Sequence, residues 1–396
     1  MMKVGFIGLG SMGSPIARRL ARSGFDVTGC DISPVMLEAF DEPGTKRSSD
    51  PLQTARDSNL LGGCVRTDEQ LESLVDGGKL YAALGKGGTL ILHSTVSPDL
   101  ARKLAAQAKE CGVGFLDVGV SGGGPAAIEG QLSLWIGGED ADIERARPWL
   151  EAIGKKLSHL GPVGRGQEGK LINNLVSIAN YGMSAAIVDI GVSMGFERQR
   201  LIDALMAGSA QSFALGVGPR FVLPREGTGA PGSFLGLHDL LKKDVDHAAE
   251  LPTNETVALR SLVEAAEFML ARIRRAAAEA EGKPTPADPQ ATVDGYFAAV
   301  RARDIDALMA LYAEDATFTL PNGKSFTGKD TIRGVHQRVL DSGSPFPSPG
   351  ARFVGAEGIA VEIEAQLPDG SVRNTTNHYR FDETGKILSL GVYARG

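Results

Sequence analysis

The stretch Lys3-Val4-Gly5-Phe6-Ile7-Gly8-Leu9-Gly10-Ser11-Met12-Gly13 decides the fold of the first part of the chain. A short apolar run leads into three glycines spaced Gly-x-Gly-x-x-Gly, and a helical pattern follows over Ser14–Ser23. The first glycine allows a tight turn, the second lets a pyrophosphate approach the backbone, and the third lets helix and strand pack closely. The start of the helix then offers free N–H groups to phosphates. We therefore predict a dinucleotide site formed by Gly8, Leu9, Gly10, Ser11, Met12 and Gly13.

A carboxylate follows the second predicted strand, Asp26–Cys30. Asp31 stands about 20 residues after the glycine turn, where an acidic side chain can accept both hydroxyls of the adenosine ribose. Ile32 and Ser33 offer no arginine for a 2′-phosphate. The pattern favours NAD and leaves NADP possible. Asp31 can also cap a helix that begins at Pro34, which is compatible with a ribose contact.

Short apolar runs alternate with helical patterns over the first 165 residues. This alternation predicts βαβ units and a mainly parallel, doubly wound Rossmann sheet. From Gly169 to about Glu281 the strand signal disappears, so we expect an all-helical domain in which Ser177–Met194 is buried on most sides. Glycine and proline between Gly208 and Gly236 predict loops that cap a cleft. The predicted strands are Lys3–Ile7, Asp26–Cys30, Asn59–Val65, Thr89–His93, Gly114–Val118, Gln131–Ile136 and Lys156–Leu160.

A break follows at Gly282-Lys283-Pro284-Thr285-Pro286-Ala287-Asp288-Pro289. Three prolines in six residues stop any helix or central strand. Beyond them, helices are expected over Ala291–Arg303 and Ile305–Tyr312, followed by strands that indicate an α+β domain on a curved sheet. We predict a dinucleotide-binding domain over 1–165, a helical substrate and dimerisation domain over 166–282, a linker over 283–290 and a third domain over 291–396. The third domain's strands are expected at Thr317–Leu320, Ser325–Thr327, Ala351–Val354, Ile359–Gln366, Val372–Phe381 and Ile387–Val392.

Composition restricts the partners. The net charge of −7 over 396 residues argues against a nucleic-acid or anionic-membrane surface, which would require a basic face. Three scattered cysteines indicate reduced thiols and no metal site. We find no secretory signal and no run of about 20 apolar residues, and expect a cytoplasmic protein.

Three further segments end strands or begin a helix, where open α/β sheets bind ligands. His93–Pro98 and Asp117–Pro125 each follow a predicted strand, and the small residues of the second can cradle a carboxylate with backbone N–H groups. In the third segment, Gly161–Asn174, the side chains of Lys170 and Asn174 are four residues apart and share one helix face.

Residues 3 to about 265 resemble the 3-hydroxyisobutyrate dehydrogenase family, β-hydroxyacid dehydrogenases related to 6-phosphogluconate dehydrogenase and the imine reductases. The glycine turn, Ser121-Gly122-Gly123, the Gly-x-x-x-Lys-x-x-Asn-Asn segment ending at Asn174, and Lys243-Asp244 occur in the family's order.

The resemblance implies an NAD(P)-dependent oxidoreductase acting on a 3-hydroxy acid or related carbonyl compound, as a homodimer or higher homo-oligomer. It makes Lys170 the acid/base and Asn174 a substrate-positioning residue. A lysine that loses hydration favours its neutral form and can accept a hydroxyl proton; the alternative is an ordinary surface lysine. The remaining roles implied are carboxylate binding by Ser121, Gly122 and Gly123, cofactor contact by Val65, a place between cofactor and substrate for Thr95, and site closure over cofactor and substrate by Lys243.

The chain departs from the family in its substrate-side loops. Val118-Gly119 replaces the usual Ala-Pro, Gly63-Cys64-Val65-Arg66 replaces a Leu-Pro contact to the cofactor, and the closing tail is absent. The resemblance therefore implies the reaction class and leaves the substrate open. His93 and His159 are interpreted as structural residues at strand ends.

The segment Ala291–Val392 resembles the ketosteroid isomerase-like branch of the nuclear transport factor 2 superfamily, which includes polyketide cyclases. The resemblance puts Tyr296 at the tyrosine of the isomerase oxyanion hole and Asn377 at its aspartate, while Leu320 occupies the position of the proton-moving base. Isomerase activity is therefore not expected. A different base (Glu362, Glu364 or His336) would make the chain bifunctional, with isomerase, lyase or dehydratase chemistry. Otherwise the domain binds or dimerises, and Glu362 and Glu364 form a solvated strand face. Imine or carbonyl reduction is a further alternative for the first part.

Overall fold

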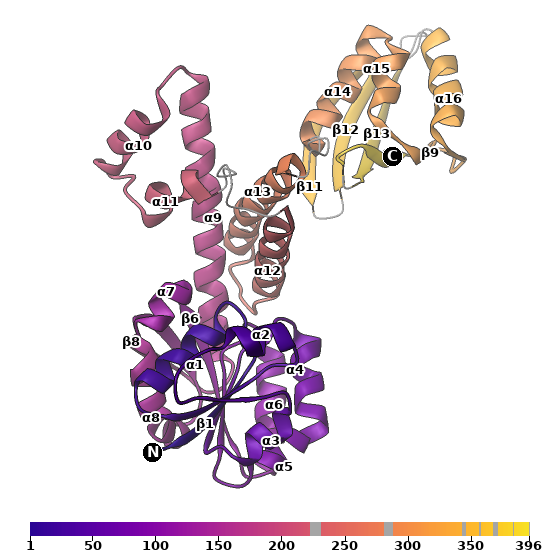
Figure 1. The fold of residues 1–396 in the computed structure, drawn as a ribbon. Helices are drawn as coiled ribbons and strands as arrows, with labels where there is room; N and C mark the ends of the chain where they lie inside the picture. Colours follow the sequence, from indigo (N-terminus) through magenta and orange to yellow (C-terminus); the bar gives the residue numbers. More distant parts are fainter. Residues whose placement is uncertain are drawn as a thin grey trace. The chain divides into compact units, whose positions relative to one another are not determined.

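The computed structural model describes residues 1–221, 231–280, 288–342, 346–355, 358–366, 371–382 and 384–395 (Figure 1). The chain divides into two compact units, Met1–Arg274 and Arg275–Gly396. Most of the predicted linker, residues 283–287, lies outside the described part of the chain, and Asp288 caps the helix that follows.

An eight-stranded sheet forms the base of the first unit, in the order β3-β2-β1-β4-β5-β6-β7-β8. All its neighbouring strands run parallel except β6 and β7. The predicted doubly wound Rossmann sheet is thereby confirmed. The short edge strand β3 was not predicted, because its three residues, two of them exposed, carry no apolar run. The strands are β1 Lys3–Ile7, β2 Asp26–Cys30, β3 Lys46–Ser48, β4 Leu60–Gly63, β5 Thr89–Leu92, β6 Gly114–Ser121, β7 Leu132–Gly137 and β8 Gly154–Gly161.

The helices between these strands begin at recognisable caps. Ser33, Asp50 and Ser97 each accept a backbone N–H and precede a proline, while Thr67 forms a capping box with Gln70. These local signals set where each connection turns back over the sheet. The helices are α1 Gly13–Arg22, α2 Pro34–Ala39, α3 Pro51–Arg56, α4 Asp68–Val75, α5 Lys79–Leu84, α6 Pro98–Glu110, α7 Gly123–Ile128 and α8 Asp140–Ile153.

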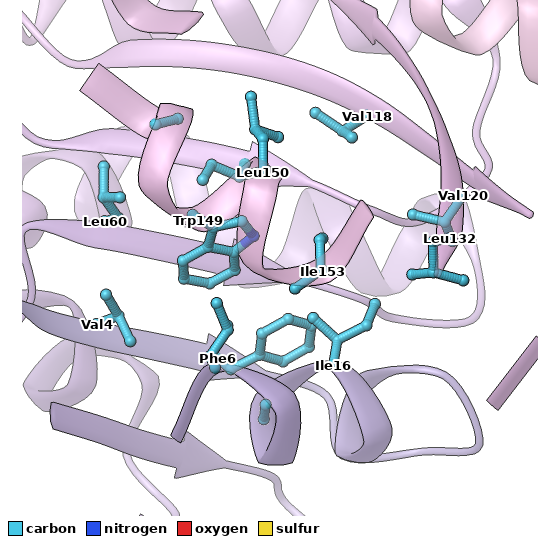
Figure 2. Close-up of a cluster of buried hydrophobic side chains, with 14 of the residues drawn as sticks. Val4, Phe6, Ile16, Leu60, Val118, Val120, Leu132, Trp149, Leu150 and Ile153 are labelled. Atoms are coloured by element: carbon cyan, nitrogen blue, oxygen red, sulfur yellow. The ribbon is translucent and has the colours of Figure 1, made fainter. Parts of the chain in front are cut away.

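Apolar clusters cover both faces of the sheet. On one face Phe6 and Trp149 stack with ring centroids 5.9 Å apart, among side chains from α1 and α8 such as Ile16 (Figure 2). On the other face Ile7 and its neighbours pack against α3 to α6. Alternate residues of β1 thus point to opposite layers, as a sheet buried on both sides requires. The packing fixes the strand ends from which the loops of the site project.

A helical layer completes the first unit: α9 Arg165–Ser193, α10 Arg198–Met206, α11 Phe213–Phe221, α12 Pro231–Ala249 and most of α13 Thr256–Ala280. Helix α13 extends beyond Arg274, the last residue of the first unit. Two expectations were wrong. The region 208–236 contains α11 and the start of α12 rather than loops alone, and residues 222–230 lie outside the described part. Helix α9 is not buried on most sides, since Ile187 and Ile190 are 48% and 54% exposed.

The second unit is the expected α+β domain. Its six-stranded sheet has the order β10-β9-β14-β13-β12-β11 and packs against α14 Pro289–Ala302 and α16 Lys329–Asp341. Helix α16 was not predicted. Tyr312 begins β9 instead of ending a helix, because α15 (Ile305–Ala310) stops two residues earlier. The strands are β9 Tyr312–Thr319, β10 Ser325–Thr327, β11 Phe346–Gly355, β12 Gly358–Gln366, β13 Val372–Phe381 and β14 Ile387–Ala394.

Candidate active site

A cleft of about 590 Å³ lies in the first unit. Its walls come from the glycine turn, the ends of β4, β5 and β6, and helices α9, α12 and α13. The structure brings most of the predicted site residues together here. Those that line the cleft are Gly10, Ser11, Met12, Gly13, Val65, Thr95, Ser121, Gly122, Gly123, Lys170, Asn174 and Lys243.

The glycine turn fits a dinucleotide phosphate. Gly8 has a φ of +91°, and a Cβ there would overlap the Cys64 carbonyl oxygen. A Cβ on Gly13 would overlap the Gly8 carbonyl oxygen, so the helix start packs directly on the turn. By contrast, nothing lies within 4 Å of a Cβ built on Gly10, which borders the cleft. The first and third glycines therefore serve packing, and the second leaves space for a ligand.

Asp31 joins the glycine turn to the end of β2. Its Oδ2 accepts the Leu9 N–H at 2.7 Å, and its Oδ1 accepts the Ser33 N–H at 2.8 Å. Each carboxylate oxygen keeps a further lone pair for a ribose hydroxyl. Gly8, Leu9 and Asp31 do not themselves line the cleft, and they support the turn that does.

Lys170 lies in the second turn of α9 with its ammonium group against β6. Its Nζ donates to the Val120 carbonyl oxygen at 2.8 Å and lies 5.9 Å from the centre of the Trp135 ring. Burial lowers the pKa of Lys170; the nearby Asp244 carboxylate opposes this shift and Lys243 adds to it. The side chain is therefore easier to deprotonate than an exposed lysine.

Gly119 makes the close approach of Lys170 possible. A Cβ built on Gly119 would lie 2.6 Å from the Lys170 Cβ, far inside van der Waals contact. The stem of Lys170 therefore lies directly against the β6 backbone. With the present backbone, a side chain at position 119 would require α9 or the lysine to shift.

Asn174, Lys243 and Asp244 form a polar group beside Lys170. Asn174 Nδ2 donates to Asp244 Oδ2 at 2.6 Å, and Lys243 Nζ lies 3.6 Å from Asp244 Oδ1. Lys243 Nζ also donates to the Thr95 carbonyl oxygen. Burial raises the pKa of Asp244, and its Oδ1 accepts no hydrogen bond. Asp244 was noted in the sequence only as the neighbour of Lys243, because nothing in the pattern signals that it is buried.

Two buried residues that the sequence reasoning missed hold the site in place. Asp117, fully buried in β6, accepts the N–H groups of Gly164 at 2.9 Å and Gln167 at 2.8 Å, at the start of α9. The Gln167 side chain donates to the Ser94 carbonyl oxygen at 2.9 Å and accepts the Val96 N–H at 3.0 Å. The segments carrying Lys170 and Thr95 are therefore tied together. Both residues lie inside quoted segments, but residue type alone does not reveal such contacts.

The two histidines occupy structural positions. His93 is buried beside the rings of both Phe6 and Trp149; its Nδ1–H donates to the Val118 carbonyl oxygen at 3.2 Å, and its Nε2 accepts the Trp149 indole N–H at 3.2 Å. Burial lowers the pKa of His93 to about 4, so the ring is neutral. His159 Nε2 lies 3.1 Å from the Gly138 carbonyl oxygen at the sheet edge.

The second unit buries the predicted pair Tyr296 and Asn377 in its core. Asn377 Nδ2 donates to the Tyr379 hydroxyl at 3.1 Å, and the Tyr379 ring lies 5.4 Å from that of Tyr296. The Asn377 Oδ1 atom is buried without a hydrogen-bond partner. Leu320, at the expected base position, packs against the same core.

The alternative bases do not carry a free charge into that core. Glu362 pairs with Arg395 at 2.9 Å, and Glu364 is exposed. The alternate residues of the same strand, Val361 and Ile363, are the ones that are buried. His336 is buried, lies 2.9 Å from the Tyr312 hydroxyl through its Nε2, and has its pKa lowered by burial to about 4. The strand-face interpretation of the glutamates agrees with this geometry.

Comparison with protein families identifies three regions. Residues 3–161 match the NAD binding domain of 6-phosphogluconate dehydrogenase, and residues 164–285 match the NAD-binding domain of NADP-dependent 3-hydroxyisobutyrate dehydrogenase. Residues 293–390 match the SnoaL-like domain. The predicted nicotinamide cofactor and the two-part resemblance are confirmed.

Individual relatives support the same family assignment for the first part of the chain. The chain is 30% identical over 254 residues to NAD-dependent L-serine dehydrogenase of Pseudomonas aeruginosa, covering 63% of this chain and 85% of the relative. It is 34% identical over 251 residues to 2-hydroxy-3-oxopropionate reductase of Escherichia coli, covering 63% and 84%. The structure of Psf3 in complex with NADP+ and 2-OPP aligns with a TM-score of 0.58 and 25% identity, covering 68% of this chain and 94% of that one. Over its first 285 residues the chain therefore belongs to the 3-hydroxyisobutyrate dehydrogenase family of nicotinamide-dependent oxidoreductases.

Proposed function

We propose that the first unit transfers a hydride between NAD and a 3-hydroxy acid or its carbonyl product, with Lys170 as acid/base. The observation that carries the proposal is the position of the Lys170 ammonium: in the cleft, bonded to Val120 and with its pKa lowered by burial. A lysine in this state can accept the hydroxyl proton in one direction and return it in the other.

Each neighbouring group has a defined task. The Ser121-Gly122-Gly123 loop holds the substrate carboxylate with its N–H groups, and Asn174, oriented by Asp244, positions the hydroxyl. Lys243, bonded to the Thr95 carbonyl oxygen, closes the site between substrate and cofactor. When bound over the glycine turn, the nicotinamide supplies or receives the hydride. Asp31 favours NAD, and NADP remains a possible cofactor.

Removing Lys170 tests the proposal. Lys170→Ala is expected to lower kcat by about 10²- to 10⁴-fold, the usual contribution of a positioned acid/base. NADH binding, followed by fluorescence, should stay within a few-fold of the unchanged protein. Full activity of the variant would contradict the assignment. Lys156→Ala, at an exposed position on β8, is a matched control and should leave both quantities unchanged.

We further propose that a second copy of the chain covers the outer face of α9. Ile172, Val176, Met183, Ile187 and Ile190 recur at helical spacing on one side of α9 and are each 42–56% exposed. That side is opposite the one that carries Lys170 and Asn174.

Helix α9 is long and apolar enough to cross a membrane, with 44% of its most apolar window buried. A membrane would surround the charged Asp189 of that helix, which pairs with Arg198 of α10 and Arg272 of α13. A homodimer in the cytoplasm accounts for this exposed apolar face better than a membrane does. The proposal keeps the domain division 1–165, 166–282, 283–290 and 291–396. Sedimentation of the full chain should give at least a dimer, and Ile187→Glu with Ile190→Glu should reduce the size of the assembly without abolishing NADH binding.

For the second unit we propose a ligand-binding or dimerisation role rather than catalysis. The supporting observation is the buried Asn377 carboxamide beside Tyr296, with no charged base among the described residues of that core. A chain ending at Pro286 is expected to keep its hydroxy-acid kinetics and change its oligomeric state. If residues 287–396 alone converted the oxidised product further, the bifunctional alternative would hold instead.

A further inference from the structure

The cleft extends beyond the groups that the proposed reaction uses. The glycine turn, Val65 and Thr95 border the cofactor side, and Ser121–Gly123, Lys170 and Asn174 border the reacting carbon. Six further lining residues, contributed by α9, α12 and α13, form what we call the distal wall: Ile178, Tyr181, Leu237, Leu240, Leu241 and Met269. No step of the proposed function needs these side chains, so they report on the rest of the substrate.

The distal wall continues the face of α9 that carries Lys170. Positions 170, 174, 178 and 181 follow helical spacing, so their side chains share one side of the helix. At a rise of about 1.5 Å per residue, Tyr181 lies roughly 16 Å farther along the axis than Lys170. A substrate that consisted only of a carboxylate and a carbinol carbon would leave most of this length of the cleft empty.

Helix α13 closes this end of the cleft. A Cβ built on Gly182 of α9 would lie 3.1 Å from the Met269 Cβ and 3.0 Å from the Ala265 carbonyl oxygen. The glycine thus allows the two helices to approach closely and brings Met269, which is 1% exposed, to the wall. Helix α12 supplies the three leucines before it reaches Lys243.

The chemistry of the distal wall is apolar. Its only side-chain oxygen or nitrogen atom is the Tyr181 hydroxyl oxygen, and it contains no lysine or arginine, although Ser177 also lines the cleft. The two lysines of the cleft are bonded to Val120 and Thr95, and Arg66, which also lines the cleft, donates to the Gly236 carbonyl oxygen next to Leu237. The six residues of the distal wall offer no side-chain cation to a second carboxylate or a phosphate on the substrate, and desolvating such a group without a partner is costly.

We infer that the substrate is a 3-hydroxy acid bearing an apolar substituent, a branched alkyl or aromatic group, on the carbon between the carboxylate and the carbinol. The inference rests on the proposed function and adds the substrate class. The carboxylate lies at Ser121–Gly123, the carbinol at Lys170, and the substituent along the distal wall. Each methylene buried there should raise kcat/KM by roughly fourfold.

A substrate series on the full-length protein with NAD+ tests this directly. The probes are 3-hydroxypropionate, 3-hydroxyisobutyrate, 2-(hydroxymethyl)-4-methylpentanoate and 2-(hydroxymethyl)glutarate, with L-serine as the polar analogue. We expect kcat/KM to rise through the first three and to be about 100-fold lower for the glutarate than for the branched alkyl acid. The highest kcat/KM for L-serine or the glutarate, or a flat series, would overturn the inference while leaving the dehydrogenase assignment intact. No turnover of any probe with NAD+ or NADP+ would overturn the proposed function and the inference with it.

A charge placed on the wall gives a second, independent readout. Leu240 is 41% exposed, so Leu240→Lys should fold, and Leu235→Lys, at a 39% exposed position of α12 outside the cleft lining, is the matched control. The Leu240→Lys variant should lose about tenfold in kcat/KM for the branched alkyl acid and gain about tenfold for the glutarate, whereas the control should change neither by more than about twofold. NADH affinity should be the same in all three proteins. Equal effects of Leu240→Lys on both substrates would contradict a substituent at this wall.

Discussion

The Asp117 carboxylate accepts the backbone N–H of Gln167 at 2.8 Å, across 50 residues of sequence. This bond and the one to Gly164 place a buried negative charge at the start of α9, where the helix has unpaired N–H groups. Lys170 follows Gln167 by less than one turn. Its position therefore depends on a strand residue that lies outside the cleft lining.

Gln167 is predicted to position the Thr95 turn against α9. Gln167→Leu removes the bonds to the Ser94 carbonyl oxygen and the Val96 N–H and leaves these buried groups unpaired, at about 1–3 kcal/mol each. We expect a lower Tm and a fall in kcat of at least about tenfold. NADH affinity should change much less. Gln199→Leu, which removes an exposed side-chain bond to Asp203 on α10, is the control and should alter neither quantity. A Gln167 variant that lost NADH affinity and kcat in equal proportion would indicate general unfolding instead.

Gly119 is predicted to set the placement of Lys170 in this chain, where the two residues are in close contact. Gly119→Ala puts a methyl carbon 2.6 Å from the Lys170 Cβ, so α9 or the lysine must shift. A displacement of this size should lower kcat by about 100-fold and leave NADH affinity nearly unchanged. Gly63→Ala is the matched control, because its methyl would meet only Leu92 Cδ1, at 4.0 Å. Equal activity of the two alanine variants would show that the contact between position 119 and Lys170 does not affect the reaction.

Asp31 is predicted to set the cofactor preference. Asp31→Asn keeps an acceptor for one of the backbone N–H groups but removes the negative charge that opposes a 2′-phosphate. The ratio of kcat/KM for NAD+ to that for NADP+ should fall by at least about tenfold. Steady-state kinetics with each cofactor at a fixed hydroxy acid measure it. An unchanged ratio would place the selectivity elsewhere.

The sequence predicted those features that depend on local pattern. The glycine turn, the strands that alternate with helices, and the spacing of Lys170 and Asn174 follow from residue type and periodicity, and the structure has them. Contacts between distant segments were not predicted, because the residue types of Asp117 and Gln167 do not indicate which groups they hydrogen-bond. Helix α16 escaped notice because it lies within a region read as a run of strands. The exposed face of α9 was interpreted as buried, since apolar composition alone does not tell whether the covering surface belongs to the same chain.

The pH dependence of kcat/KM tests the role of Lys170 most directly. Burial lowers the pKa of Lys170, and oxidation of the alcohol requires its neutral form. The rate of oxidation should therefore rise with pH through an apparent pKa below 10.5, and the rate of carbonyl reduction should fall over the same range. Lys170→Arg, whose guanidinium stays protonated, should be slow in oxidation and lack this titration. A profile identical in Lys170→Arg and the unchanged protein would contradict proton transfer by Lys170.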